Sequence, residues 1–208
     1  MQTSHVISDL FLASTCLWVL YQCWKRHESP LIIVWGLFFG FVGLAAFFGA
    51  LRFADVHPNM VHVSQFFQRL ASTLGSCGLV AGVAWLFKRY HSLPLLTCTV
   101  IACIACVVAD FIIDKTSYYS IVQMIAMVLV LAIAVFHWIK RRLPEHRTMA
   151  WRLVLAIVLS ALATTSLQML PAPYSIDAFH YLLGAGILCF GWAAMSQLES
   201  GQALTPQV

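Results

Sequence analysis

Seven long apolar segments dominate this chain and restrict the folds that it can adopt. They cover approximately residues 6–24, 31–53, 64–87, 94–113, 119–139, 150–170 and 178–197. An α-helix needs about 20 mainly apolar residues to cross the hydrocarbon core of a bilayer. The segments have roughly that length, so the sequence predicts an all-α membrane protein built as a bundle of seven transmembrane helices.

The composition excludes the main soluble alternatives. The chain has 208 residues, of which 61% are hydrophobic and only 10% are charged, whereas soluble domains carry about 25% charged residues. A globule of this size cannot bury so much apolar surface, and disordered or nucleic-acid-binding chains are far more polar. We therefore expect the lipid bilayer to be the main partner of this protein, and we expect no nucleic-acid partner. The sequence leaves the oligomeric state open.

The basic residues indicate the orientation in the membrane. They gather in every second gap between apolar segments, at Lys25, Arg26, Lys88, Arg89, Lys140, Arg141, Arg142 and Arg147. The intervening gaps contain Asp55, Asp114 and Asp177, with Lys115 as the one basic residue beside them. Because cytoplasmic loops carry the excess of Lys and Arg, we predict an outer N-terminus and a cytoplasmic C-terminus. The expected location is a bacterial inner membrane.

The chain is expected to form one domain. Residues 1–197 hold the seven segments, and residues 198–208 form a polar C-terminal tail. The stretch Met1 to His5 lacks the basic residues that open a secretory signal peptide, so we expect the first segment to be retained. Cys103 and Cys106 form a C-x-x-C pattern inside an apolar segment, where cysteine normally serves as a small packing residue.

The predicted orientation places the deeper ionisable residues in the outer half of the bundle. Ionisable groups at membrane depth cost about 2.5–3.5 kcal/mol each on insertion scales, so they usually face the bundle interior or a wet cavity. The predicted ligand pocket consists of Asp9, Arg52, Gln68, Arg69, Asp110 and His180. Within it, Asp9, Arg69 and Asp110 are expected to contact one another. Arg52 has an alternative role at the interface, where a long side chain can reach water.

Histidines near the outer face raise the alternative of a metal site. His62 and His180 are the two best placed, and imidazole is a common ligand of zinc. Binding one zinc ion requires their ring nitrogens to lie roughly 4–5 Å apart, because zinc–nitrogen bonds are about 2.0–2.1 Å long. No segment carries two histidines at i,i+4, the helical spacing typical of such sites. The sequence therefore predicts no definite cofactor, and zinc is the alternative.

The seven-helix plan, the outer N-terminus and the sequence Phe179-His180-Tyr181 resemble the superfamily of alkaline ceramidases and progestin/adiponectin-type receptors. The resemblance implies a seven-helix membrane protein related to zinc-dependent hydrolases of lipid amides. Of that superfamily's metal-site pattern, His180 is the residue that this chain retains. Where the pattern has aspartate in the third helix and a second histidine in the seventh, this chain has Gln65 or Gln68 and Gly184. The resemblance thus implies a divergent member whose metal site is lost or replaced.

Three functions remain open from the sequence, and it does not decide whether the protein is an enzyme. The first is a non-enzymatic role, in which the outward-facing pocket binds a small or lipidic ligand or serves a membrane assembly. The second is a membrane-embedded metal-dependent hydrolase of lipid amides or esters that uses His62 and His180. The third is a proton-coupled permease that uses Asp9, Arg69 and Asp110.

Overall fold

The computed structural model of the chain is helical throughout the elements that it describes. The described residues are 2–25, 31–87, 97, 101–102, 104–105, 108–109, 116–140, 144–172 and 174–202. The elements are α1 (Gln2–Lys25), α2 (Leu31–Phe53), α3 (Met60–Leu70), η1 (Ala71–Gly75), α4 (Ser76–Phe87), α6 (Thr116–Lys140), α7 (Pro144–Met169) and α8 (Tyr174–Gln202). The π-helical turn η1 joins α3 to α4 in one continuous helix.

Six helices in the described part of the chain are long and apolar enough to cross a membrane. They are Thr3–Lys25, Ile32–Phe53, Met60–Phe87, Tyr118–Lys140, His146–Met169 and Tyr174–Ser196. These helices match six of the seven predicted segments and support a multi-pass membrane protein. The remaining segment, 94–113, lies outside the described residues except for isolated positions.

Several helices begin before the apolar segments that predicted them. The segment predicted from residue 6 belongs to a helix that starts at Gln2, and the segment predicted from residue 178 belongs to a helix that starts at Tyr174. The last helix also continues to Gln202, into the predicted polar tail. Hydropathy finds the part of a helix that crosses the hydrocarbon, whereas its polar first and last turns extend beyond that part.

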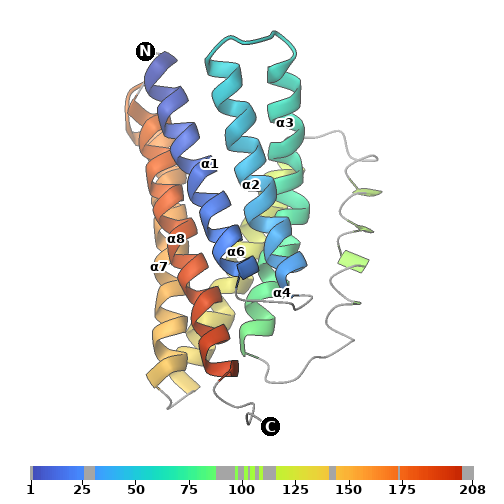
Figure 1. Cartoon of the computed structure of the whole chain (residues 1–208), viewed down its shortest axis with the longest axis vertical. Helices are drawn as coiled ribbons and strands as arrows, with labels where there is room; N and C mark the ends of the chain where they lie inside the picture. The colour runs from blue at the N-terminus through green and yellow to red at the C-terminus, as the bar shows by residue number, and fades with distance from the viewer. Residues whose placement is uncertain are drawn as a thin grey trace.

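Some neighbouring helices run in opposite directions and others run in the same direction, and α1 begins at the end of the bundle opposite to the end at which α8 finishes (Figure 1). The α1–α2 pair is antiparallel, since Gly49 lies against Asp9 and Gly36 lies toward Leu20. The α7–α8 pair is antiparallel as well, since Arg152 contacts Trp192 and Gly186 lies against Ala156, and α8 packs beside both α7 and α1. Consequently α1 and α8 begin at the same end of the bundle and run in the same direction (Figure 1).

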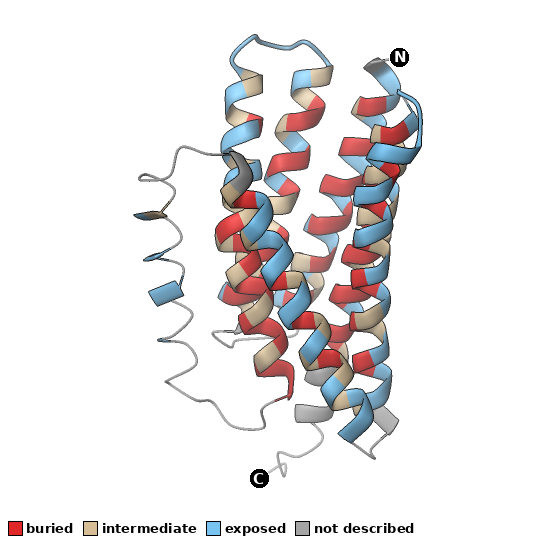
Figure 2. Cartoon of the chain, turned by 180° about the vertical axis from the view of Figure 1, so that it is seen from behind, coloured by how far each residue is buried: buried red, intermediate tan, exposed pale blue. Residues whose placement is uncertain are grey.

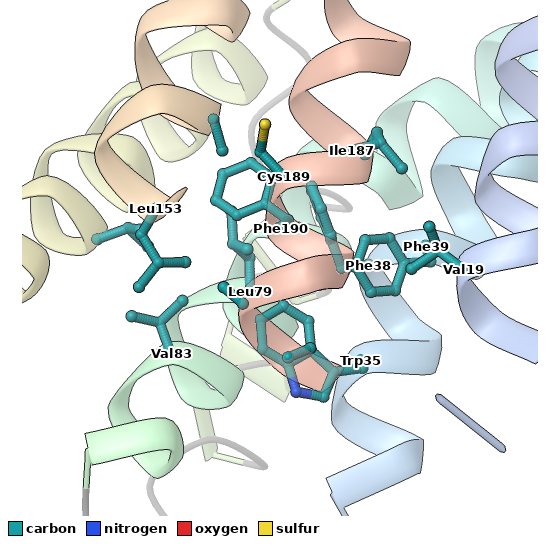
Figure 3. Packing of buried hydrophobic residues seen from close by; sticks show 14 of the residues in the cluster. Val19, Trp35, Phe38, Phe39, Leu79, Val83, Leu153, Ile187, Cys189 and Phe190 are labelled. Carbon is teal, nitrogen blue, oxygen red and sulfur yellow. The ribbon is translucent and has the colours of Figure 1, made fainter. Parts of the chain in front are cut away.

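Apolar side chains fill the centre of the bundle, and more apolar side chains cover much of its outside. Buried residues form stripes that face the neighbouring helices, while the outer surface carries exposed residues (Figure 2). Trp35 and Phe39 of α2 stack at 5.5 Å, and Phe190 of α8 meets Phe38 edge-on at 5.6 Å (Figure 3). Exposed residues such as Trp18, Phe47 and Val128 fit a surface that faces lipid.

Candidate functional site

Several polar residues near the starts of α1 and α8 meet in one cluster between these two helices. His5, Ser8 and Asp9 lie on α1, and Asp177 and His180 lie on α8. Residues three or four positions apart share one face of a helix, so the spacing directs each set toward the other helix. We call these five residues, together with Ser4, the outer polar cluster, because the predicted orientation would place this end of the bundle outside the membrane.

Asp177 is the acceptor at the outer end of the outer polar cluster. One carboxylate oxygen, Oδ1, lies 2.8 Å from His5 Nδ1 and 2.9 Å from Ser8 Oγ. The other oxygen, Oδ2, accepts a hydrogen bond from Ser4 Oγ. Asp177 also lies in the first turn of α8, where the positive end of the helix dipole stabilises a carboxylate. Its side chain is 14% exposed, so the cluster reaches the surface here.

Asp9 and His180 form the inner end of the outer polar cluster. His180 Nδ1 lies 3.0 Å from Ser8 Oγ, and His180 Nε2 lies 3.1 Å from Asp9 Oδ1. Ser8 is completely buried, and Asp9 and His180 are 2% and 9% exposed. Hydrogen bonds therefore run from Asp177 through Ser8 and His180 to a carboxylate that is shielded from water.

The second oxygen of Asp9 points toward α2. Asp9 Oδ2 is buried and accepts no hydrogen bond from the residues that the structure describes. A Cβ atom placed on Gly49 would lie 2.7 Å from this oxygen, so glycine at this position makes room for the carboxylate. Arg52 lies one turn further along α2, with its guanidinium 5.4 Å from the ring centre of Phe53. The Phe53 ring in turn lies 5.0 Å from the ring of His5.

The structure brings only part of the predicted ligand pocket together. Asp9 and His180 are in direct contact, and Arg52 is an exposed residue near them at the end of α2. Gln68 and Arg69 are exposed on α3. The Arg69 guanidinium lies 5.3 Å from the ring centre of Tyr119, so its aromatic partner lies on α6 and its expected contact with Asp9 is not among the described interactions. Asp110 lies outside the described residues.

The predicted metal ligands do not form a recognisable metal site. His62 is exposed on α3, and both ring nitrogens of His180 already have partners in Ser8 and Asp9. In the part of the chain that the structure describes, no three His, Cys, Asp or Glu residues are arranged to hold a metal ion. The positions of these side chains therefore support neither the predicted zinc site nor the metal-dependent hydrolase that would use it.

Ser8, His180 and Asp9 have the residue types of a serine hydrolase triad, but their environment differs from that of a nucleophile. An attacking hydroxyl must reach the substrate, whereas Ser8 is fully buried. Its oxygen also lies 2.9 Å from the Asp177 carboxylate, which competes with the imidazole for the hydroxyl proton. The arrangement is better suited to holding and passing protons than to attacking a carbonyl.

The sequence patterns did not identify Ser4, His5, Ser8 or Asp177 as members of the site. His5 and Asp177 fall outside the predicted apolar segments, and Ser8 is one of many small hydroxyl residues. A usable signal was present in the spacing, because residues 5, 8 and 9 share one face of a helix that begins earlier than hydropathy indicates.

The comparisons with known proteins identify the chain at the level of its family. No curated protein and no solved structure matches it. The model of a family of unknown function, DUF6962, matches residues 4–199 and therefore includes the whole outer polar cluster. Since that match covers nearly the full length, the chain belongs to the DUF6962 family of unknown function.

Proposed function

We propose that this protein crosses a bacterial inner membrane seven times, with its N-terminus outside, and binds a small or lipidic ligand at its outer end. The number of crossings is supported by the direction of two helices. Arg69 meets Tyr119 and Phe87 meets His137, so the α3–α4 helix and α6 run in the same direction. Two successive spans of the same direction need a crossing between them, and the apolar segment 94–113 has the required length.

Reporter fusions test this topology. Alkaline phosphatase is active only outside the cytoplasm, so a fusion within residues 54–59, between α2 and α3, is expected to be active. A fusion after Val208 is expected to be inactive, because the basic gaps orient the C-terminus toward the cytoplasm. A fusion after Val208 that is as active as the first would contradict the cytoplasmic C-terminus and the odd number of crossings.

The observation that carries the binding proposal is the buried, unpartnered oxygen of Asp9. An acceptor that is buried without a donor costs about 1–3 kcal/mol. A ligand that donates an N–H or O–H group to Asp9 Oδ2 would remove this cost. The exposed Arg52 lies near the same oxygen at the outer end of α2, which indicates entry from the outside. The expected ligand therefore carries an ammonium or hydroxyl group.

Thermal unfolding of the protein in phosphatidylcholine nanodiscs tests this binding. These lipids have no N–H or O–H donor, so ethanolamine and glycerol can serve as soluble probes. We expect at least one probe to raise the unfolding midpoint of the wild type but not that of the Asp9→Leu variant, which has no acceptor at this position. Asp55→Asn is the matched control, because Asp55 is an exposed carboxylate between α2 and α3.

The control variant should respond to the probe as the wild type does. A midpoint that neither probe raises, or one that rises equally in Asp9→Leu, would refute binding at Asp9. The second candidate function, a proton-coupled permease, is favoured by the hydrogen bonds that connect Asp9 with the partly exposed Asp177. Chains of Asp and His residues within membrane helices typically mark proton pathways in transporters.

A further inference from the structure

The single hydroxyl proton of Ser8 determines how the outer polar cluster is protonated. Ser8 Oγ lies 2.9 Å from Asp177 Oδ1, 3.1 Å from the backbone oxygen of His5 and 3.0 Å from His180 Nδ1. Two of these neighbours are oxygens, the Asp177 carboxylate and the His5 carbonyl. While Asp177 is ionised, both can only accept a hydrogen bond from Ser8. The carboxylate is the strongest acceptor of the three, so Ser8 donates to Asp177.

The tautomer of His180 follows from this assignment. If Ser8 donates to Asp177, its oxygen can only accept from the imidazole, and Nδ1 must carry a proton. A neutral imidazole with a proton on Nδ1 has a lone pair on Nε2. This lone pair would face Asp9 Oδ1 at 3.1 Å. An ionised carboxylate and a lone pair repel each other at that distance, so a proton must lie between them.

We propose that Asp9 and His180 together bind one proton, and that Ser8 and Asp177 connect this proton to the outer surface. The proton resides either on Asp9, which gives a neutral pair, or on the imidazole, which gives an ion pair. In both states Asp9 and His180 together carry no net charge. That neutrality suits a pair whose members are 2% and 9% exposed, because an isolated charge is costly to bury.

Release of the proton can proceed through the existing hydrogen bonds. Starting from the neutral pair, the proton of Asp9 moves to His180 Nε2, and the proton on Nδ1 moves to Ser8. The original hydroxyl proton of Ser8 moves to Asp177, which passes it to water at the surface. One proton leaves, Asp9 becomes ionised, and His180 remains neutral in the opposite tautomer. Ser8 then donates to His180 and no longer to Asp177.

Protonation is thereby linked to the contact between α1 and α8. In the released state Asp177 loses the hydrogen bond from Ser8, while a buried carboxylate is left beside the neutral His180. Among the residues that the structure describes, the other charged or titratable groups that face the pair are His5 on α1, Arg52 on α2 and Asp177 on α8. Arg52 is the nearby cation, and its guanidinium group is attracted toward the new negative charge on Asp9. This proposal does not depend on the identity of any ligand.

Nitrogen-15 NMR of histidine-labelled protein in phosphatidylcholine nanodiscs tests the proposal without a ligand. The two ring nitrogens give distinct signals when protonated and unprotonated, and the spectrum of His180→Gln identifies the His180 signals by their loss. At neutral pH we expect Nδ1 of His180 to carry a proton. On raising the pH, Nδ1 should lose its proton and Nε2 should retain one. An unprotonated Nδ1 at neutral pH would overturn the proposal.

Asp9→Asn provides the matched variant, because its amide can donate permanently to Nε2 and so imitates protonated Asp9. We expect Nδ1 of His180 in this variant to stay protonated over the pH range in which the wild type loses this proton. Titration of the wild type should release one more proton than titration of the variant. Equal proton release, or the same change of tautomer in both proteins, would overturn the proposal. Failure of the ligand test leaves these measurements unaffected.

Discussion

Asp177→Ala is expected to lower the free energy of unfolding by about 3 kcal/mol, because hydrogen bonds to charged groups contribute about 1.5–3 kcal/mol each. The substitution removes the shared acceptor of Ser4, His5 and Ser8. Two of these donors are buried and cannot turn to water instead. The loss also leaves the contacts of His180 with Ser8 and Asp9 as the remaining polar contacts between α1 and α8 within the outer polar cluster. Unfolding by SDS in mixed micelles measures the effect.

Two further substitutions distinguish the loss of the hydrogen bonds at Asp177 from the loss of one negative charge. Asp177→Asn retains one carbonyl oxygen, so we expect a destabilisation smaller than that of Asp177→Ala. Asp55→Asn removes an exposed carboxylate at a residue with φ of 54°, a backbone conformation that asparagine tolerates well. Its stability should therefore match that of the wild type. If Asp177→Ala were as stable as Asp55→Asn, the outer polar cluster would not hold α1 and α8 together.

The helices were predictable because lipid requires long apolar segments. Most of the outer polar cluster, however, lies in the first turns of α1 and α8, which need not be apolar. Residues 31–53 were predicted with the observed bounds of α2, since this helix is apolar from end to end. The helix that contains Asp177 starts at Tyr174, before the apolar pattern begins. A polar first turn carries little hydropathy signal, so the sequence places Asp177 just before the predicted segment and does not include it in the predicted pocket.

Pairing between helices was the harder part of the prediction. Depth alone grouped Asp9 with His180 in one predicted pocket, and the structure places these two side chains in contact. Depth did not show which helix faces which, so Arg69 was expected near Asp9 although its guanidinium lies over Tyr119 of α6. That choice depends on helix order and rotation, which packing decides. The glycine at position 49 is one such packing feature, because it lets α2 approach Asp9.

The second large effect is expected at Gly78, where α4 crosses the backbone of α2. A Cβ atom at this position would lie 2.6 Å from the carbonyl oxygen of Val34 and 3.0 Å from Leu37 Cβ. Backbone atoms cannot turn aside as a flexible side chain can, so Gly78→Leu must push the two helices apart. Overpacking typically costs about 1–3 kcal/mol, and we expect a loss at the upper end of that range in SDS unfolding.

Gly40→Leu is the matched control, because a Cβ atom added at Gly40 meets nothing within 4 Å. Both substitutions replace a helical glycine by a better helix former, a gain of about 0.8 kcal/mol that is common to the two variants. The difference between them therefore isolates the helix contact. Gly40→Leu should be as stable as the wild type or more so, while Gly78→Leu should be clearly less stable. Equal stabilities would mean that α2 and α4 are not in close backbone contact at Gly78.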